Sequence, residues 1–223
     1  EMFLCIQDES SGAIRVQIES ASSSPSLLNS KQYTVKTHPK IDKQLYTENL
    51  VIGLKSAKRP FPAGNLKVLT WRMQEEDESH LPFTVSCWPS EVSEGLSVNV
   101  EYELVRKDIS LNNVVIAIPI PDTENVNVES IEHGHYKLDA KNQLFLWYLD
   151  NVDESIGNVS GSLEFVVSGV RGDDSSCFPV HVQFSSQKTL IGASVGNVVS
   201  AIDGKPVDYS KETLLQVAEY TIV

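Results

Sequence analysis

The sequence is poor in cysteine, in long apolar runs and in basic residues, and each shortage excludes a class of protein. Its 223 residues include three cysteines that lie far apart, too few for a disulfide framework or a four-thiolate zinc site, so we expect a reduced, cytosolic chain. No apolar run approaches the roughly 20 residues that span a bilayer, and no signal-peptide pattern opens the chain. Because it begins with Glu1 rather than Met, we expect part of a longer protein.

The charge of the chain is unevenly distributed. With 18 basic and 30 acidic residues the net charge is −12, which argues against nucleic acid as a partner, because such binding depends on basic groups that neutralise phosphate. Residues 31–67, however, carry a net charge of +6, and the rest of the chain −18. An acid-flanked peptide or an anionic membrane surface responds to this local potential, so neither is excluded.

Short apolar or alternating runs between turn residues are the main pattern, and a period of two predicts an all-β chain. Helix is expected only as one or two turns within residues 42–50. Residues 139–142 (DAKN) and 203–206 (DGKP) predict turns, and residues 19–30 and 74–80 predict loops. The expected strands are residues 2–7, 13–19, 66–73, 83–88, 97–104, 114–118, 134–138, 144–149, 161–168, 180–185, 193–201 and 214–222.

Two short patterns suggest chemistry, and neither has the context that it needs. Residues 192–196 (GASVG) match the nucleophile elbow of a serine hydrolase around Ser194, but β-branched residues and a turn follow where a helix is required. A glycine-flanked strand edge or bulge is the simpler interpretation. His133 and His135 resemble a zinc-ligand pair without an evident third ligand. We expect no catalytic residue, no metal and no cofactor.

Several longer strings resemble one family in a single order along almost the whole chain. They are THPKIDKQLY (37–46), IGLK (52–55), VLTWR (68–72), LPFTVSCWPS (81–90), VEYEL (100–104), VIAIPIP (115–121), SGSLEF (160–165) and FPVHV (178–182). Together they resemble the μ-homology domain of the δ subunit of coatomer, the COPI vesicle coat, within the adaptor medium-subunit family. The resemblance implies an elongated β-sandwich of two subdomains, with subdomain B (89–185) inserted in subdomain A (1–88 and 186–223).

The resemblance also implies a function in peptide binding. Related adaptor subunits hold tyrosine-based signals with a Trp-x-Arg element, whose counterpart here is the sequence VAE at 217–219, so that specificity is not expected. The resemblance to the δ-coatomer domain implies instead the binding of tryptophan-containing, acid-flanked segments of an ER tethering complex and of an Arf GTPase-activating protein. Implied partners also include other coatomer subunits, with peripheral association on Golgi membranes and COPI-coated vesicles.

Such a peptide needs an apolar cleft for indole rings and a cation for its flanking acids. We expect the pocket where the segment after residue 121 packs on the hairpin of residues 134–149; core packing is the alternative interpretation. Its candidate residues are Val128, Ile131, Tyr136, Lys137 and Trp147, and a possible basic contact consists of Lys36, Lys40 and Lys43. A second hypothesis is a purely structural coat-assembly domain, because Leu144, Leu146 and Tyr148 give the strand at 144–149 two apolar faces.

Overall fold

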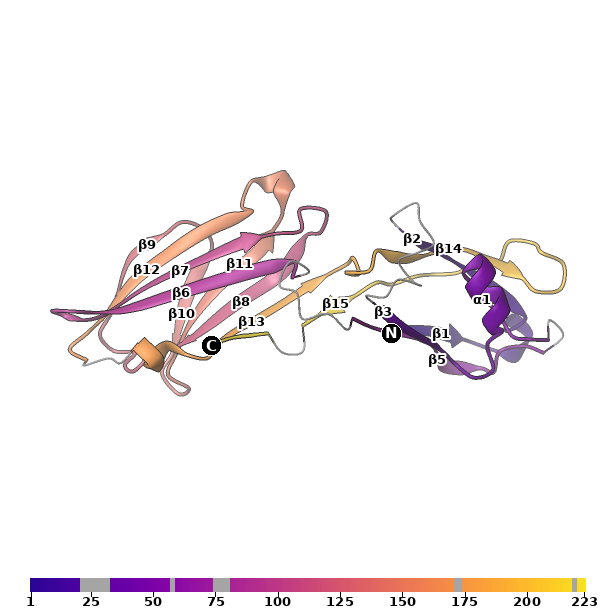
Figure 1. Cartoon of the computed structure of the whole chain (residues 1–223), viewed down its shortest axis with the longest axis horizontal. Helices are drawn as coiled ribbons and strands as arrows, with labels where there is room; N and C mark the ends of the chain where they lie inside the picture. Colours follow the sequence, from indigo (N-terminus) through magenta and orange to yellow (C-terminus); the bar gives the residue numbers. More distant parts are fainter. Residues whose placement is uncertain (21–32, 57–58, 74–80, 171–173, 218–219) are drawn as a thin grey trace. The chain divides into compact units, whose positions relative to one another are not determined.

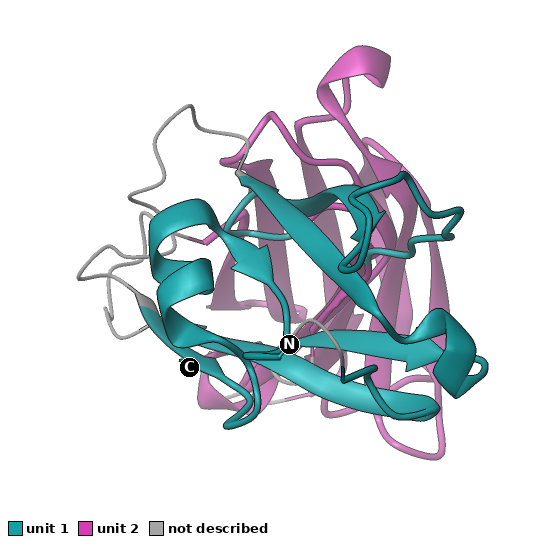
Figure 2. Cartoon of the chain, turned by 90° about the vertical axis from the view of Figure 1, so that its right-hand side faces the viewer, with its two compact units in different colours: residues 1–76, 189–213 teal, residues 77–188, 214–223 magenta. Residues whose placement is uncertain are grey.

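The computed structural model describes residues 1–20, 33–56, 59–73, 81–170, 174–217 and 220–223. It confirms the predicted all-β class: strands dominate the described chain (Figure 1). The chain forms two compact units, which Figure 2 colours separately. Unit 1 comprises residues 1–76 and 189–213, and unit 2 comprises residues 77–188 and 214–223. In sequence, most of unit 2 therefore lies between the two segments of unit 1.

Unit 1 contains two three-stranded antiparallel sheets around one apolar core. The first has the order β1-β5-β3, and the second has the order β14-β2-β4. Buried side chains that include Val16, Ile41, Ile52, Phe61 and Val68 fill the core. The strand bounds are β1 Met2–Ile6, β5 Gly64–Met73, β3 Tyr33–Thr37, β14 Ala193–Ser200, β2 Ile14–Ser20 and β4 Val51–Ile52, and a 3-10 turn covers Glu9–Ser11.

The expected short helix is present as α1 (Lys43–Asn49). Asp42 caps its first turn, because one carboxylate oxygen accepts hydrogen bonds from the backbone N–H groups of Gln44 and Leu45. Leu50 ends the helix in the left-handed conformation, with φ of 53°. The inward face of this two-turn helix buries Tyr46.

Unit 2 is a sandwich of two antiparallel sheets. One sheet has the order β10-β11-β8-β13-β15, with β16 also paired to β13, and the other has the order β6-β7-β12-β9. The bounds are β10 His135–Asp139, β11 Leu144–Val152, β8 Leu111–Pro119, β13 Val180–Ser186, β15 Leu215–Gln216, β16 Thr221–Ile222, β6 Phe83–Val92, β7 Gly95–Leu104, β12 Ser160–Ser168 and β9 Val126–Ile131. Short 3-10 turns cover Glu154–Ile156 and Asp174–Cys177.

Aromatic side chains join the two sheets of unit 2. The ring of Phe145 on β11 stacks on Phe165 of β12 with centroids 4.3 Å apart, and Trp147 meets Tyr102 of β7 edge-on at 5.4 Å. These contacts follow from strand alternation, which sends Phe145 and Trp147 to the inner face and Leu146 to the outer one. The prediction that this strand has apolar side chains on both faces is confirmed.

The structure corrects part of the predicted strand list. Residues 214–222 do not form one strand; they contain β15 and β16, each of two residues. β3, β4 and β9 were not expected as strands. Of the predicted loop at 19–30, residues 19 and 20 belong to β2, and residues 21–30 lie outside the described residues, as does the predicted loop at 74–80. Strand β6 continues through residues 88 and 89, where the boundary between subdomains A and B was expected. Strands β15 and β16, which lie in the range expected for subdomain A, belong to unit 2. The assignment of subdomains A and B stays a prediction.

Candidate functional site

Strands β9 and β10 form one open edge of the unit 2 sandwich. β9 is the last strand of its sheet and pairs with β12, and β10 is the last strand of the opposite sheet and pairs with β11. The chain crosses from one sheet to the other through residues 132–134. Glu132 donates its backbone N–H to the Ser162 carbonyl, so the pairing with β12 continues into the crossing. Both strand edges therefore lie at the same side of the sandwich.

Three of the predicted pocket residues face the space between the sheets at this edge. In the strand register, Val128 lies opposite Phe165, and Ile131 lies opposite Leu163. Tyr136 lies opposite Trp147 and stacks on Phe145 with centroids 5.1 Å apart. Val128 and Ile131 are half-buried, and Tyr136 is 43% exposed. The structure thus brings two aliphatic side chains and an accessible aromatic ring to one edge.

Trp147 lies beneath this edge and not on it. Its side chain is 0% exposed, and its Nε1 donates a hydrogen bond to the His133 carbonyl at 2.8 Å. Burial, with a smaller contribution from Glu132, raises the pKa of the neighbouring Tyr102 hydroxyl to about 12. That hydroxyl therefore stays protonated and donates to the Asn158 carbonyl. Trp147 holds the crossing from β9 to β10 in place, because its indole is anchored on both sides.

Lys137 points to the opposite face of β10 from Tyr136. It lies opposite Leu146 on the outer face of its sheet, where Leu144, Leu146 and Tyr148 are half-buried. His135 stacks on Tyr148 with centroids 5.2 Å apart. Lys137 is exposed and does not share the inner face with the aliphatic side chains. A ligand that contacts both Lys137 and the aliphatic side chains of the inner face must therefore reach the two faces of β10.

The predicted basic contact lies in unit 1. Lys36 is on β3, Lys43 is the first residue of α1, and Lys40 lies in the segment between them. Lys36 and Lys43 line one pocket of about 420 Å³, and Lys40 is not among its lining residues. The structure therefore brings two of these three lysines together.

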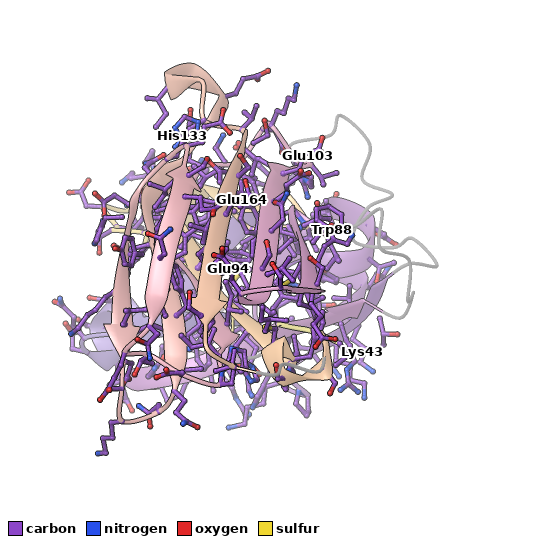
Figure 3. All side chains as sticks on the ribbon, turned by 90° about the vertical axis from the view of Figure 1, so that its left-hand side faces the viewer. Lys43, Trp88, Glu94, Glu103, His133 and Glu164 are labelled. Atoms are coloured by element: carbon purple, nitrogen blue, oxygen red, sulfur yellow. The ribbon has the colours of Figure 1, made fainter. Side chains whose placement is uncertain are left out.

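The outer face of the other sheet of unit 2 is acidic. Register places Glu101 and Glu103 of β7 on the same face as Glu164 of β12, and Figure 3 shows Glu103 and Glu164 with Trp88 on this side. Trp88 of β6 lies opposite Asn99 and is 52% exposed. An accessible tryptophan is therefore present, but the sheet face on which it lies also carries these three carboxylates.

The two chemical patterns of the sequence do not form reactive sites. Ser194 lies within β14, where the ladder with β2 shifts register between Val195 and Asn197, so the predicted bulge is confirmed and no strand-to-helix elbow exists there. Among the described residues, no three or more His, Cys, Asp or Glu side chains gather as a metal site. Of the described helices, none is long and apolar enough to cross a membrane.

Sequence reasoning missed the strand that forms half of the open edge. The alternation of Val126, Asn127 and Val128 was a signal for β9, but a single V-x-V pattern is too short to distinguish a strand from a loop. The stacked row of Tyr136, Phe145 and Phe165 depends on contacts between two sheets, and such contacts leave no periodic signal in the chain.

Comparisons with known proteins agree on one family. The model of the adaptor complexes medium subunit family matches residues 1–220. Coatomer subunit delta-1 of Oryza sativa subsp. japonica is 38% identical over 223 residues, which cover 99% of this chain and 40% of that protein. The chain thus spans about two-fifths of the length of this curated relative.

Two solved structures are similar over nearly the whole chain. The yeast delta-COP-I μ-homology domain has a TM-score of 0.81 and 27% identity, with 98% of this chain and 86% of that chain covered. The same yeast domain complexed with a Dsl1 WxWxV peptide has a TM-score of 0.75 and 25% identity, with the same shares covered. The predicted μ-homology fold is thereby confirmed.

Proposed function

The chain belongs to the adaptor complexes medium subunit family, and on that basis we propose that it is a non-enzymatic module that binds short linear peptides. The peptides carry closely spaced tryptophans and flanking acidic residues. Support comes from the similarity to coatomer δ subunits and from the similar yeast domain, which was solved with a WxWxV peptide. The observation in this chain that carries the proposal is the open edge of β9 and β10.

Strand addition at β10 matches the spacing of such a motif. Among the described strands, β10 has β11 as its one paired neighbour, so its other edge offers backbone groups to an extended peptide. In an added strand, residues two apart point to the same side. Two tryptophans in a W-x-W motif then both reach the inner face, where Tyr136, Val128 and Ile131 offer apolar surface.

Charge supports the same placement. Residues between and beside the tryptophans would point to the outer face, where Lys137 supplies a cation for acidic side chains. The alternative aromatic surface, at Trp88, lies on the sheet face that also carries Glu101, Glu103 and Glu164. Like charges would weaken the binding of an acid-flanked peptide there.

At the level of the whole protein, we propose a place in retrograde Golgi-to-ER transport as part of the COPI coat. Partners would be other coatomer subunits, an ER tethering complex and an Arf GTPase-activating protein, the last two through their tryptophan motifs. The protein would be cytoplasmic and peripheral on Golgi membranes and COPI-coated vesicles. The relatives named coatomer subunit support this assignment.

Calorimetry with an acidic W-x-W peptide tests the peptide proposal. We expect micromolar affinity, because a short flexible peptide loses chain entropy on binding, and no saturable binding of the alanine-substituted peptide. Tyr136→Ala should weaken binding about tenfold or more, the range of interface hot spots. Tyr209, which is also 43% exposed but lies in unit 1, provides the matched control Tyr209→Ala. Equal loss in both variants would contradict the placement on β10.

A purely structural role is the second candidate, and the outer face of β11 favours it. Leu144, Leu146 and Tyr148 form a half-buried apolar row on this face. If this row is an assembly surface, Leu144→Asn, which adds no charge and lies opposite Asp139 rather than Lys137, should impair incorporation into coatomer while the isolated domain keeps its peptide affinity. Normal assembly of the variant would refute this candidate.

A further inference from the structure

The pocket that Lys36 and Lys43 line is formed by residues of β3 and α1 in unit 1. The proposed peptide site does not use it. Its volume is about 420 Å³, and its lining residues are Val35, Lys36, Thr37, Lys43, Tyr46 and Thr47. None of these is acidic, and two carry ammonium groups that are exposed to solvent. The pocket therefore offers positive charge next to hydroxyl groups.

Tyr46 is the unusual member of this wall. Its side chain is only 5% exposed, and its hydroxyl oxygen is buried with no hydrogen-bond partner among the described residues. Buried hydroxyls are normally hydrogen-bonded, because desolvation without a partner is unfavourable. Burial raises the pKa of this hydroxyl to about 12, so at neutral pH it carries a proton that it can donate. One lining residue of the pocket thus has a buried hydroxyl donor without an acceptor.

The acidic groups of α1 are already engaged elsewhere. The Asp42 carboxylate accepts the N–H groups of Gln44 and Leu45 as the helix cap. Glu48 accepts a hydrogen bond from Nε2 of Gln44 at 2.9 Å. Neither carboxylate lines the pocket, so Lys36 and Lys43 set its charge.

We propose that this pocket binds a phosphate monoester, the phosphoserine or phosphothreonine of a partner polypeptide. Such a group carries close to two negative charges at pH 7 and three acceptor oxygens, which match two lysines and the Tyr46 hydroxyl. A membrane surface fits less well, because α1 and its cap carry two carboxylates, Asp42 and Glu48, against one lysine, so this element is not a positively charged face. The proposal is independent of the peptide site on β10.

The test is an NMR titration of the 223-residue chain with blocked phosphoserine, N-acetyl-O-phosphoserine N-methylamide. We expect saturable shifts of the amides of Lys36, Thr37, Lys43 and Thr47, with affinity at least tenfold above that of blocked serine. Lys36→Gln and Lys43→Gln should each weaken binding about fivefold or more. Lys55→Gln, which removes an exposed charge of the same basic segment outside the pocket, should leave it unchanged.

Tyr46→Phe separates the proposed role from a structural one. It keeps the ring and removes the unpartnered hydroxyl, so we expect unchanged or higher thermal stability together with weaker phosphoserine binding. Unaltered binding in this variant, or equal weakening by Lys55→Gln, would overturn the proposal. So would binding of inorganic phosphate alone, or binding only of vesicles that contain a phosphorylated inositol lipid, without binding of blocked phosphoserine.

Discussion

Replacement of Trp147 by phenylalanine should destabilise unit 2 and loosen the edge that carries the proposed peptide site. Trp147 is fully buried, packs edge-on against Tyr102 and donates a hydrogen bond of 2.8 Å to the His133 carbonyl. Phenylalanine keeps one aromatic ring but cannot donate this bond. The change therefore removes the anchor at the crossing between β9 and β10 and leaves a small void beside Tyr102.

The magnitude follows from these two losses. A net intramolecular hydrogen bond contributes about 1 kcal/mol, and more where the remaining carbonyl stays without a partner. The void left by the smaller ring costs roughly another 1–1.5 kcal/mol. We therefore expect Trp147→Phe to lower the free energy of unfolding by about 2–3 kcal/mol. Peptide affinity should also fall, because Tyr136 would no longer be held in one position.

Urea unfolding followed by far-UV circular dichroism measures the first effect, and hydrogen exchange of β10 and β11 amides locates it. Trp88→Phe is the matched control, since the same chemical change at a side chain that is 52% exposed should cost less than about 0.5 kcal/mol. Equal effects of the two substitutions, or a loss below about 0.5 kcal/mol for Trp147→Phe, would refute the anchoring role.

Three further predictions follow from unit 2 and the cysteines. Hydrogen bonds from hydroxyl and backbone donors lower the pKa of Asp153 to about 2 from an ordinary 3.8, so its contribution to stability is present above pH 4 and is lost toward pH 2. Asp153→Asn should thus destabilise clearly at pH 7 and only slightly at pH 2, and a constant difference would contradict this. Iodoacetamide should label exposed Cys5 rapidly and Cys87 only after unfolding, because burial raises the pKa of the Cys87 thiol to about 12; equal labelling rates would be the contrary result. Gly95→Ala should destabilise by about 2 kcal/mol or more in thermal unfolding, because φ is +151° and a Cβ would overlap the Val167 carbonyl; an unchanged melting temperature would refute it.

Sequence reasoning succeeded where the information is local. Alternation predicted most strands, and the short helix was expected within residues 42–50, where the structure has α1 with Asp42 as its cap. The hairpin at 139–142 is likewise local, because the Asp139 carboxylate accepts hydrogen bonds from the N–H groups of Lys141 and Asn142. The prediction of one strand at residues 214–222 was wrong, because the two short strands in this range are set by their pairing with two different parts of β13.

The candidate site was only partly predictable for the same reason. Val128, Ile131 and Tyr136 were expected together and do share the open edge. Trp147 was expected in the pocket, and the structure buries it below the edge. Lys137 follows Tyr136 directly, and strand alternation sends it to the other face. Residue type indicated which side chains suit a peptide, but it did not indicate which of them are buried and which are exposed.

The sequence by itself determined the all-β class, the family resemblance and the separation of a basic segment from an acidic remainder, since these depend on residue types and short-range periodicity. Only the tertiary structure decided which sheet edge is open, which tryptophan is accessible, and that Lys36, Lys43 and Tyr46 line one pocket. The physical reason is that burial and charge pairing depend on which surfaces long-range strand pairing brings together. Residues of the same type therefore have different roles according to the face on which that pairing places them.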